Sequence, residues 1–164
     1  YDEDEDEDED DDYYEFASVD YDLSKVDIML NGIKVVPSEG IADIATLVDT
    51  EGITVIKAGE YDYFYSEDYA LTIDLKNNTE ADLPIENCPV SGIDFDSYYS
   101  ENTTTELSVN GIKIGSTVKD IATAFNSEIS ESATSIDIDD IEDYKYFSFS
   151  IEDGLVTSIS YSEY

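Results

Sequence analysis

Carboxylates are the most abundant side chains in this sequence that could do chemistry. Every residue from 2 to 12 is Asp or Glu. Carboxylate oxygens suit Ca²⁺, but an EF-hand loop needs Gly at its sixth position, and the acidic stretches 94–99 and 137–144 lack it. We therefore expect weak, nonspecific cation binding, Ca²⁺ included, with no dedicated cage and no cofactor. The residues that we assign to this binding are Asp2, Asp4, Asp6, Asp8, Asp10 and Asp12.

The side chains that most enzymes use for proton transfer and anion binding are missing. The sequence contains no His and no Arg, which removes the commonest general base near neutral pH and the side chain that grips anions through two hydrogen bonds. Its one Cys, Cys88, has no His to lower the thiol pKa, so we interpret it as a small buried residue. Carboxylate pairs are too numerous to single out one for glycoside hydrolysis. The sequence therefore predicts a protein that is not an enzyme.

Tyrosines form the second group of interest. Tyr61, Tyr63 and Tyr65 alternate along the chain and would share one face of a strand, and Tyr98 and Tyr99 are adjacent. A tyrosine ring offers a flat apolar face and a polar tip, which surfaces that bind protein or glycan often use. We expect these five residues to form a ligand or partner surface. The alternative is that alternating Tyr and Phe side chains fill the core.

The net charge of −35 restricts the partners. Such a surface repels the phosphates of nucleic acids and anionic lipid headgroups, because no basic stripe neutralises them. We expect a protein or glycan ligand, with cationic partners favoured, or copies of the same chain. No stretch approaches the roughly 20 apolar residues of a membrane-spanning helix, so we expect no transmembrane segment.

An internal repeat organises the rest of the chain. NGIK occurs at residues 31–34 and 110–113, and DIAT follows at 43–46 and 120–123. In each copy, alternating apolar residues lead into Asn-Gly, which favours a tight hairpin, then comes a helical apolar pattern, and then strand-like stretches. The helical patterns cover 41–48 and 118–129. The sequence therefore predicts an α+β fold of two duplicated units packed together, each a β-hairpin, one helix and an antiparallel meander.

The repeat also predicts the domain boundaries. We expect an acidic disordered tether over residues 1–22, a first α+β unit over 23–96 and a second over 97–164. The acidic run has no counterpart before the second NGIK. We therefore interpret it as a self-repelling, extended spacer outside the duplicated body.

Four stretches of the sequence resemble a known group of proteins. They are residues 30–34, residues 109–115, NNTEADLPIENCPVSGIDF between the units, and SFSIEDGLVTSISY at the end. These are similar to exported clostridial (gut Firmicutes) lipoproteins of uncharacterised function, in which a linker after a lipidated Cys precedes two related α+β units. The resemblance covers roughly residues 26–162. It implies export and an extracellular location at the bacterial cell surface.

These features predict a non-enzymatic, exported or cell-surface binding protein of unknown ligand with an acidic N-terminal spacer. The alternative is a self-assembling structural subunit of an extracellular filament or surface layer. Strand edges would then pair between copies, and cations would screen the repulsion between their acids. A third reading is an ordinary protein of a salt-accumulating cell, where acidic surfaces are general.

Overall fold

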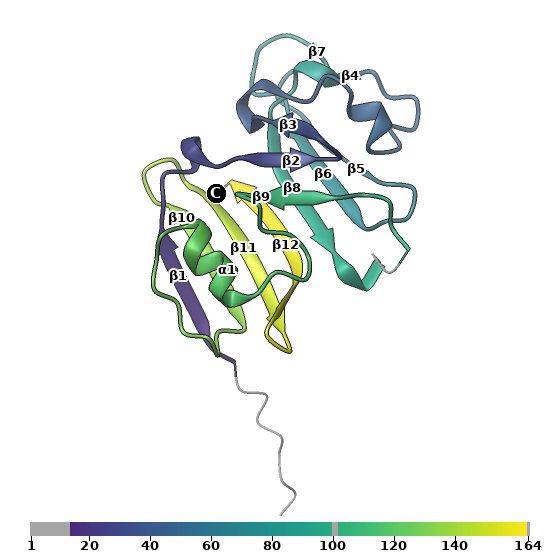
Figure 1. Cartoon of the computed structure of the whole chain (residues 1–164). Coiled ribbons are helices and arrows are strands. Elements are labelled where there is room, and N and C mark those ends of the chain that lie inside the picture. The colour runs from purple at the N-terminus through teal and green to yellow at the C-terminus, as the bar shows by residue number, and fades with distance from the viewer. Residues whose placement is uncertain (1–13, 100–101, 164) are drawn as a thin grey trace, which may run out of the picture.

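The computed structural model describes residues 14–99 and 102–163, and this part of the chain is built mainly from β-strands (Figure 1). The strands are β1 (Phe16–Asp20), β2 (Ile28–Leu30), β3 (Ile33–Val35), β4 (Val55–Ile56), β5 (Tyr61–Tyr65), β6 (Leu71–Lys76), β7 (Leu83–Pro84), β8 (Val90–Asp96), β9 (Leu107–Val109), β10 (Ser135–Asp140), β11 (Lys145–Glu152) and β12 (Leu155–Glu163). The helices are α1 (Val118–Ala124) and the short 3₁₀ helices η1 (Leu23–Lys25), η2 (Pro37–Glu39), η3 (Ile44–Thr46), η4 (Ile85–Asn87) and η5 (Ser97–Tyr99).

Seven strands form one mixed sheet in the order β1-β10-β11-β12-β8-β6-β5. The first half of the body supplies the antiparallel run β5-β6-β8 and the second half supplies β10-β11-β12, and the two runs meet where β8 pairs with β12. Strand β1 pairs in parallel with β10 at the edge of the sheet. The boundary predicted at residue 22 therefore follows the first strand of the sheet instead of preceding it.

The two NGIK sequences make the same turn in both halves. Asn31 and Asn110 have φ values of 50° and 49°, and the Gly that follows each of them also has a positive φ. Positive φ at both central residues is what a type I′ turn requires, as the sequence predicted. The first turn joins β2 to β3, whereas the second closes on the single bridge between Val109 and Ile112.

The two hairpins are joined by pairing between β2 and β9, which gives a three-stranded sheet in the order β3-β2-β9. The side-chain oxygen of Asn31 accepts a hydrogen bond from the backbone N–H of Glu106 at 2.7 Å. The side-chain oxygen of Asn110 accepts the equivalent bond from Asp27 at 2.8 Å. A local two-fold symmetry therefore relates the halves here, and each Asn fastens its own turn to the other half.

The predicted fold class, α+β with a helix in each of two packed units, is wrong. The described chain is mostly β, its one α-helix lies in the second half, and both meanders belong to a single mixed sheet. Helix α1 begins at a capping box, in which the Thr117 hydroxyl accepts from the N–H of Asp120 and the Asp120 carboxylate accepts from the N–H of Thr117. In the aligned first half, Gly40 takes the place of Thr117 with a φ of 77°, offers no capping side chain, and only η3 forms.

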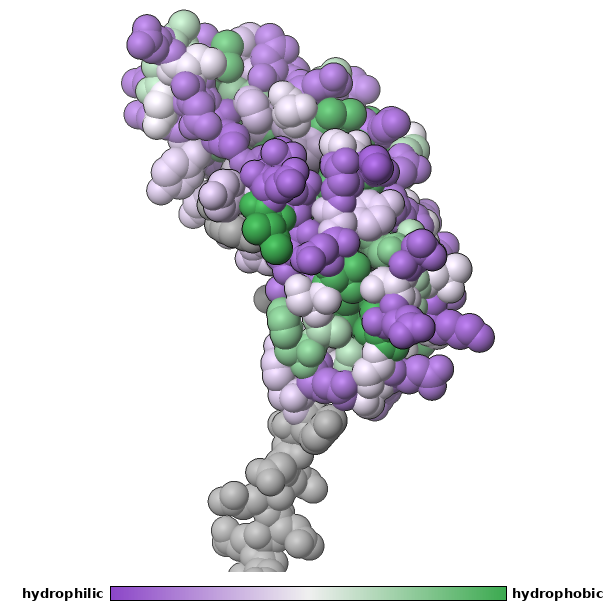
Figure 2. Space-filling view, turned by 90° about the vertical axis from the view of Figure 1, so that its left-hand side faces the viewer, coloured by the Kyte–Doolittle hydropathy of each residue, from purple (hydrophilic) through white to green (hydrophobic). Residues whose placement is uncertain are grey.

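The large sheet buries one of its faces. Helix α1 and the β3-β2-β9 sheet lie over that face (Figure 1), and the ring of Phe125, just after α1, lies 6.2 Å from that of Phe149 on β11. The largest fully buried side chains include Phe147, Phe149, Ile73, Leu75, Ile136 and Ile159. On the opposite face the same strands carry Ser, Thr, Asp and Tyr. Hydrophilic residues also dominate the side of the molecule that Figure 2 shows, with apolar residues in separate patches.

Candidate functional site

The candidate site is the polar face of the seven-stranded sheet, which we call the open face. Alternate residues of a strand point to opposite faces, so strand register determines which side chains are neighbours there. One row across the sheet reads Asp137, Ser148, Ser160, Asp94, Thr72 and Tyr65. The small Ser and Thr side chains keep the middle of this face flat, so the larger Asp and Tyr side chains project from it.

Three aspartates crowd together on the first-half part of the open face. Desolvation raises the pKa of Asp94, and the nearby carboxylates of Asp96 and Asp74 raise it further. Desolvation also raises the pKa of Asp74, whose carboxylate lies over Gly92 so closely that a Cβ at Gly92 would be 2.7 Å from its Oδ2. A cationic group placed among these carboxylates would relieve their repulsion and favour their ionised forms.

Three tyrosines from β5 and the turn after it gather beside these aspartates, and we call them the tyrosine cluster. The ring centroids of Tyr63 and Tyr65 are 5.7 Å apart in an edge-to-face arrangement, and those of Tyr65 and Tyr69 are also 5.7 Å apart. The exposed fractions of Tyr63, Tyr65 and Tyr69 are 56%, 43% and 65%. Their rings are therefore packed against one another and still open to solvent.

Two shallow hollows flank the tyrosine cluster. One, of about 600 Å³, is lined by Tyr65, Tyr69, Ala70, Thr72, Asp94 and Asp96. The other, of about 510 Å³, has only acidic residues among its charged lining: Asp49, Glu51, Asp62 and Glu67. The face of an aromatic ring attracts a cation, and nearby carboxylates add their charge to that attraction. This arrangement can bind an ammonium or a guanidinium group.

Tyr69 was not among the predicted site residues. It has a φ of 61°, which is unusual for a bulky residue, and it lies in the tight turn between β5 and β6. The carboxylate of Asp68 holds that turn by accepting hydrogen bonds from the Ser66 hydroxyl at 2.7 Å and from the N–H of Ala70 at 3.1 Å. The polar Ser-Glu-Asp stretch between two strand-like runs was the available signal, because the hairpin it predicts brings Tyr69 near Tyr65.

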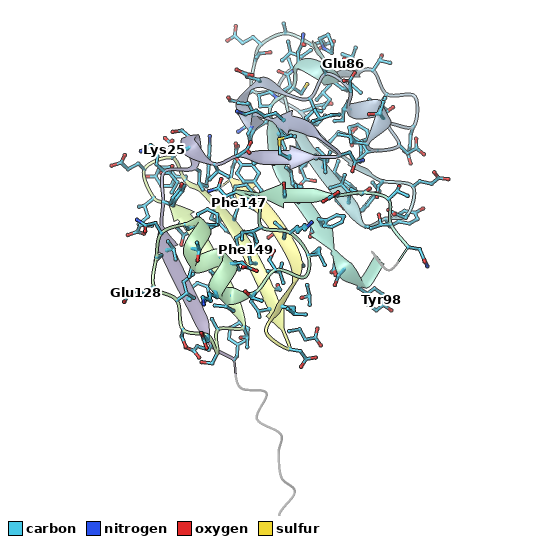
Figure 3. The ribbon with its side chains drawn as sticks, viewed as in Figure 1. Lys25, Glu86, Tyr98, Glu128, Phe147 and Phe149 are labelled. Carbon is cyan, nitrogen blue, oxygen red and sulfur yellow. The ribbon has the colours of Figure 1, made fainter. Side chains whose placement is uncertain are left out.

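The predicted tyrosine surface is only partly brought together. Tyr61, Tyr63 and Tyr65 are exposed on one face of β5, which contradicts the alternative that they fill the core. Tyr98 is 83% exposed and lies in η5, directly after β8 (Figure 3), while the side chain of Tyr99 is outside the described part. The role of these residues as a ligand surface stays a prediction.

Cys88 was interpreted as a small buried residue, and the structure confirms this. Its side chain is fully buried, and its thiol donates to the backbone carbonyl of Pro84 at 3.4 Å. Burial raises the pKa of the Cys88 thiol, and the carboxylate of Glu86 raises it further. The thiol therefore stays protonated at neutral pH.

The acidic run 2–12, assigned to weak cation binding, lies outside the described residues, so that assignment stays a prediction. Within residues 14–99 and 102–163, no three or more Cys, Asp or Glu side chains are grouped so that they could hold a metal ion. No helix in the same ranges is long and apolar enough to cross a membrane. Comparisons of the chain with protein-family models, curated proteins and solved structures found no match.

Proposed function

We propose that this protein is a non-enzymatic binding protein whose open face takes a basic, extended segment of a protein partner. The observation that carries the proposal is the position of Tyr65 and Tyr69 beside Asp94 and Asp96 around one hollow. Lys and Arg side chains combine an apolar stem with a cationic head. A basic segment can therefore lay its stems on the tyrosine rings and direct its heads to the carboxylates.

The charge of the whole chain supports a basic partner. A net charge of −35 attracts polycations over several ångströms and accelerates their encounter with the protein, and salt screens this attraction. The raised pKa values of Asp74 and Asp94 favour the same partner, because a bound cation stabilises carboxylates that otherwise repel one another. Binding should therefore weaken as salt is added and as the pH falls through these pKa values.

Titration of a fluorescent ten-residue peptide of alternating Lys and Ser, followed by anisotropy, tests the proposal. We expect Tyr65→Ala and Tyr69→Ala each to weaken binding about tenfold, because each removes a ring face from the hollow. A peptide with Glu in place of Lys should not bind.

The matched control is Tyr144→Ala, which removes a tyrosine that is 60% exposed on the turn between β10 and β11. It should leave affinity for the Lys peptide unchanged. Equal losses of affinity in the control and in the cluster variants would mean that general charge attraction alone accounts for binding, which would contradict the proposal. The absence of Lys-peptide binding at low salt would also overturn it.

The two edges of the sheet favour a second candidate, self-assembly into a filament or surface layer. Strand β5 is at the edge of the sheet. The backbone N–H of Ser66 donates to the carbonyl of Leu71, and that of Asn77 donates to the carbonyl of Glu60, so the even-numbered residues of β5 make its backbone hydrogen bonds with β6. The backbone groups of its tyrosines therefore point away from β6. Two of these groups already have partners, because the Tyr65 carbonyl accepts from the N–H of Asp49 and the Tyr63 N–H donates to the Asp62 carboxylate. Sedimentation with and without about 5 mM Ca²⁺ tests this, because cations must screen the charge before edges can pair. A monomer under both conditions contradicts it.

We also propose that the protein acts outside the cell, at the bacterial surface. A strongly acidic, charge-rich exterior suits a protein that meets basic partners in the medium. Labelling of intact cells with a membrane-impermeant amine reagent tests the location, because the exposed lysines of a surface protein should react before lysis. Labelling only after lysis would contradict it.

A further inference from the structure

A second cavity differs from the open face in its chemistry, because several of the few lysines of the chain line it. It has a volume of about 320 Å³ and lies between the β2–β3 hairpin, η1, η2 and the strands β11 and β12. Three of the seven lysines line it: Lys25, Lys34 and Lys145. Two aromatic rings, Phe147 and Tyr161, also line it with their centroids 5.0 Å apart. Figure 3 labels two of these residues, Lys25 on η1 and Phe147 on β11.

The internal repeat supplies a counterpart for comparison. A smaller hollow of about 170 Å³ in the second half is lined by Phe95, Thr103, Thr105, Glu106, Leu107, Lys113 and Ile114. The NGIK alignment places Lys113 at the position of Lys34, and Glu106 at the position of Asp27. The same alignment places Leu107 at the position of Ile28 and Ile114 at the position of Val35, and these residues also line the two cavities. The two cavities are therefore two versions of one site.

The two versions differ in how the shared lysine is neutralised. In the second half, the Lys113 ammonium lies 3.6 Å from the Glu106 carboxylate. In the first half, Asp27 is one methylene shorter than Glu106, and no carboxylate of the described residues lies within 4.0 Å of Lys34 or Lys145. Lys25 has a neighbour, Asp22, at 3.9 Å. The first-half cavity therefore contains two ammonium groups, those of Lys34 and Lys145, that no described carboxylate pairs with, whereas Lys113 in the smaller hollow is paired with Glu106.

We infer that the first-half cavity binds a small organic carboxylate with an apolar body. The carboxylate occupies, on Lys34 and Lys145, the place that Glu106 occupies on Lys113. The apolar body lies on Val26, Val36 and Pro37, which line the same cavity and are half-buried, whereas the rings of Phe147 and Tyr161 are only 1% and 2% exposed. The volume falls at the lower end of the range for small-molecule sites, about 300–1,000 Å³. Asp27 and Asp143 also line the cavity, so it takes a monocarboxylate in preference to a dianion or a phosphate.

Titration of 4-phenylbutyrate into the full-length protein, followed by amide chemical shifts, tests the inference. We expect saturable binding with shifts in the β2–β3 hairpin and in β11. The neutral analogue 4-phenylbutanamide should bind at least about tenfold more weakly, because it lacks the charge that the two ammonium groups recognise. Lys34→Gln and Lys145→Gln should each weaken 4-phenylbutyrate binding by about tenfold or more.

Two further variants separate this site from general charge effects. Lys113→Gln makes the same change in net charge at the equivalent position of the second half, and it should leave binding unchanged. Asp27→Glu keeps the net charge and gives the first half the carboxylate length of Glu106, so it should weaken 4-phenylbutyrate binding by pairing with Lys34.

Three outcomes would overturn the inference. They are no saturable binding of acetate, hexanoate or 4-phenylbutyrate up to about 10 mM, equal affinity for the amide analogue, or an equal loss in Lys113→Gln and Lys34→Gln. Tyr65→Ala should leave this site intact, so the inference and the proposed function can fail separately.

Discussion

The two halves of the body share a backbone framework but differ in what they place on it. Both halves carry the same Asn-Gly turn, and their meanders meet symmetrically at β8 and β12. On the open face, however, Asp94 of the first half lies opposite Ser160 of the second. Asp96 of β8 likewise lies opposite Ser158 of β12, whereas Gly92 lies opposite Ser162. The backbone geometry thus survives duplication, while the two central strands differ in charge, because β8 carries aspartates where β12 carries serines. On the second half, the acidic and aromatic residues of this face lie farther out, at Asp137, Asp139 and Tyr146.

The region of α1 shows a second difference between the halves, because both share a helical apolar spacing but only the second half forms an α-helix. Ile41, Ile44 and Val48 are buried, as the helical pattern of the first half predicted, although no α-helix forms there. The apolar spacing therefore predicted most of the burial here, although Ala45 of that pattern is exposed and Leu47, outside it, is buried. The aligned capping positions differ: Thr117 completes a capping box at the start of α1, whereas Gly40 has a φ of 77° and no side chain that could accept a hydrogen bond.

Truncation of the core where the halves meet should have the largest effect. Leu30 and Leu107 are cross-strand partners in β2 and β9, and they are 0% and 1% exposed. We expect Leu30→Ala and Leu107→Ala each to lower the free energy of unfolding by about 3 kcal/mol, measured by urea denaturation. The double variant should lose less than the sum, because the two side chains share one contact. A loss below about 1 kcal/mol in either single variant would contradict the placement of that side chain in the shared core.

Substitutions at the two aligned capping positions, Gly40 and Thr117, should change stability by different amounts. A Cβ at Gly40 would lie 2.5 Å from the carbonyl oxygen of Glu86 and 2.9 Å from that of Cys88. We therefore expect Gly40→Ala to destabilise the protein by about 3 kcal/mol, through both this clash and its positive φ. Thr117→Ala should cost only about 1 kcal/mol, because it removes one cap.

Gly111→Ala is the control for the effect of positive φ. It has a φ of 79° but nothing within 4 Å of the added Cβ, so it should cost about 1 kcal/mol. Thermal unfolding followed by circular dichroism measures all three variants. Equal losses at Gly40 and Gly111 would show that close packing at Gly40 contributes nothing.

Much of this fold was readable from the sequence because it depends on local patterns. Asn-Gly marked both turns, and alternation marked β5, β6, β8 and the strands of the second half. Alternation failed after residue 151, where a bulge shifts the β11–β12 register, so that Val156 is buried and Leu155 is 44% exposed. The merger of the two meanders depends on pairing between β8 and β12, which are distant in the sequence, and no local pattern reports such a contact.

The candidate site was less predictable than the fold, for the same reason. The alternation of Tyr61, Tyr63 and Tyr65 correctly placed them on one face. Their aspartate neighbours come from β6 and β8, so only the sheet register brings Asp94 beside Tyr65. The lysine-lined cavity could not be predicted from the sequence, because Lys34 and Lys145 belong to different halves and only the fold brings them to one cavity.

Replacement of the turn asparagines should have an intermediate effect on the free energy of unfolding, and the effect should be the same in the two halves. Asn31→Ala and Asn110→Ala each remove a hydrogen bond to the other half and place Ala at a positive φ, so each should cost about 2 kcal/mol. Asn31→Gly and Asn110→Gly keep the turn geometry and should cost about 1 kcal/mol, which isolates the hydrogen bond. Urea denaturation measures the four variants. A Gly variant as unstable as its Ala counterpart would assign the whole effect to the lost hydrogen bond.

The smallest effect on stability should depend on pH and should distinguish the aspartate-bearing strand β8 from the serine-bearing strand β12. Because the pKa of Asp94 is raised in the folded protein, the fold holds a proton that the unfolded chain releases at about pH 3.9. The contribution of Asp94 to the free energy of unfolding therefore falls as the pH rises through that window. Asp94→Asn should thus stabilise the protein at pH 7 by less than about 1 kcal/mol and make no difference below about pH 3.

Ser160→Asp tests the opposite change at the symmetric position. It places a new carboxylate directly across from Asp94 and should destabilise the protein at pH 7 but not at about pH 3, since both groups are then protonated. Urea denaturation at the two pH values distinguishes charge repulsion from a packing effect, which would be the same at both. If Asp94→Asn also weakens binding of the Lys peptide while stabilising the fold, then the acidity of the first half costs stability and serves binding.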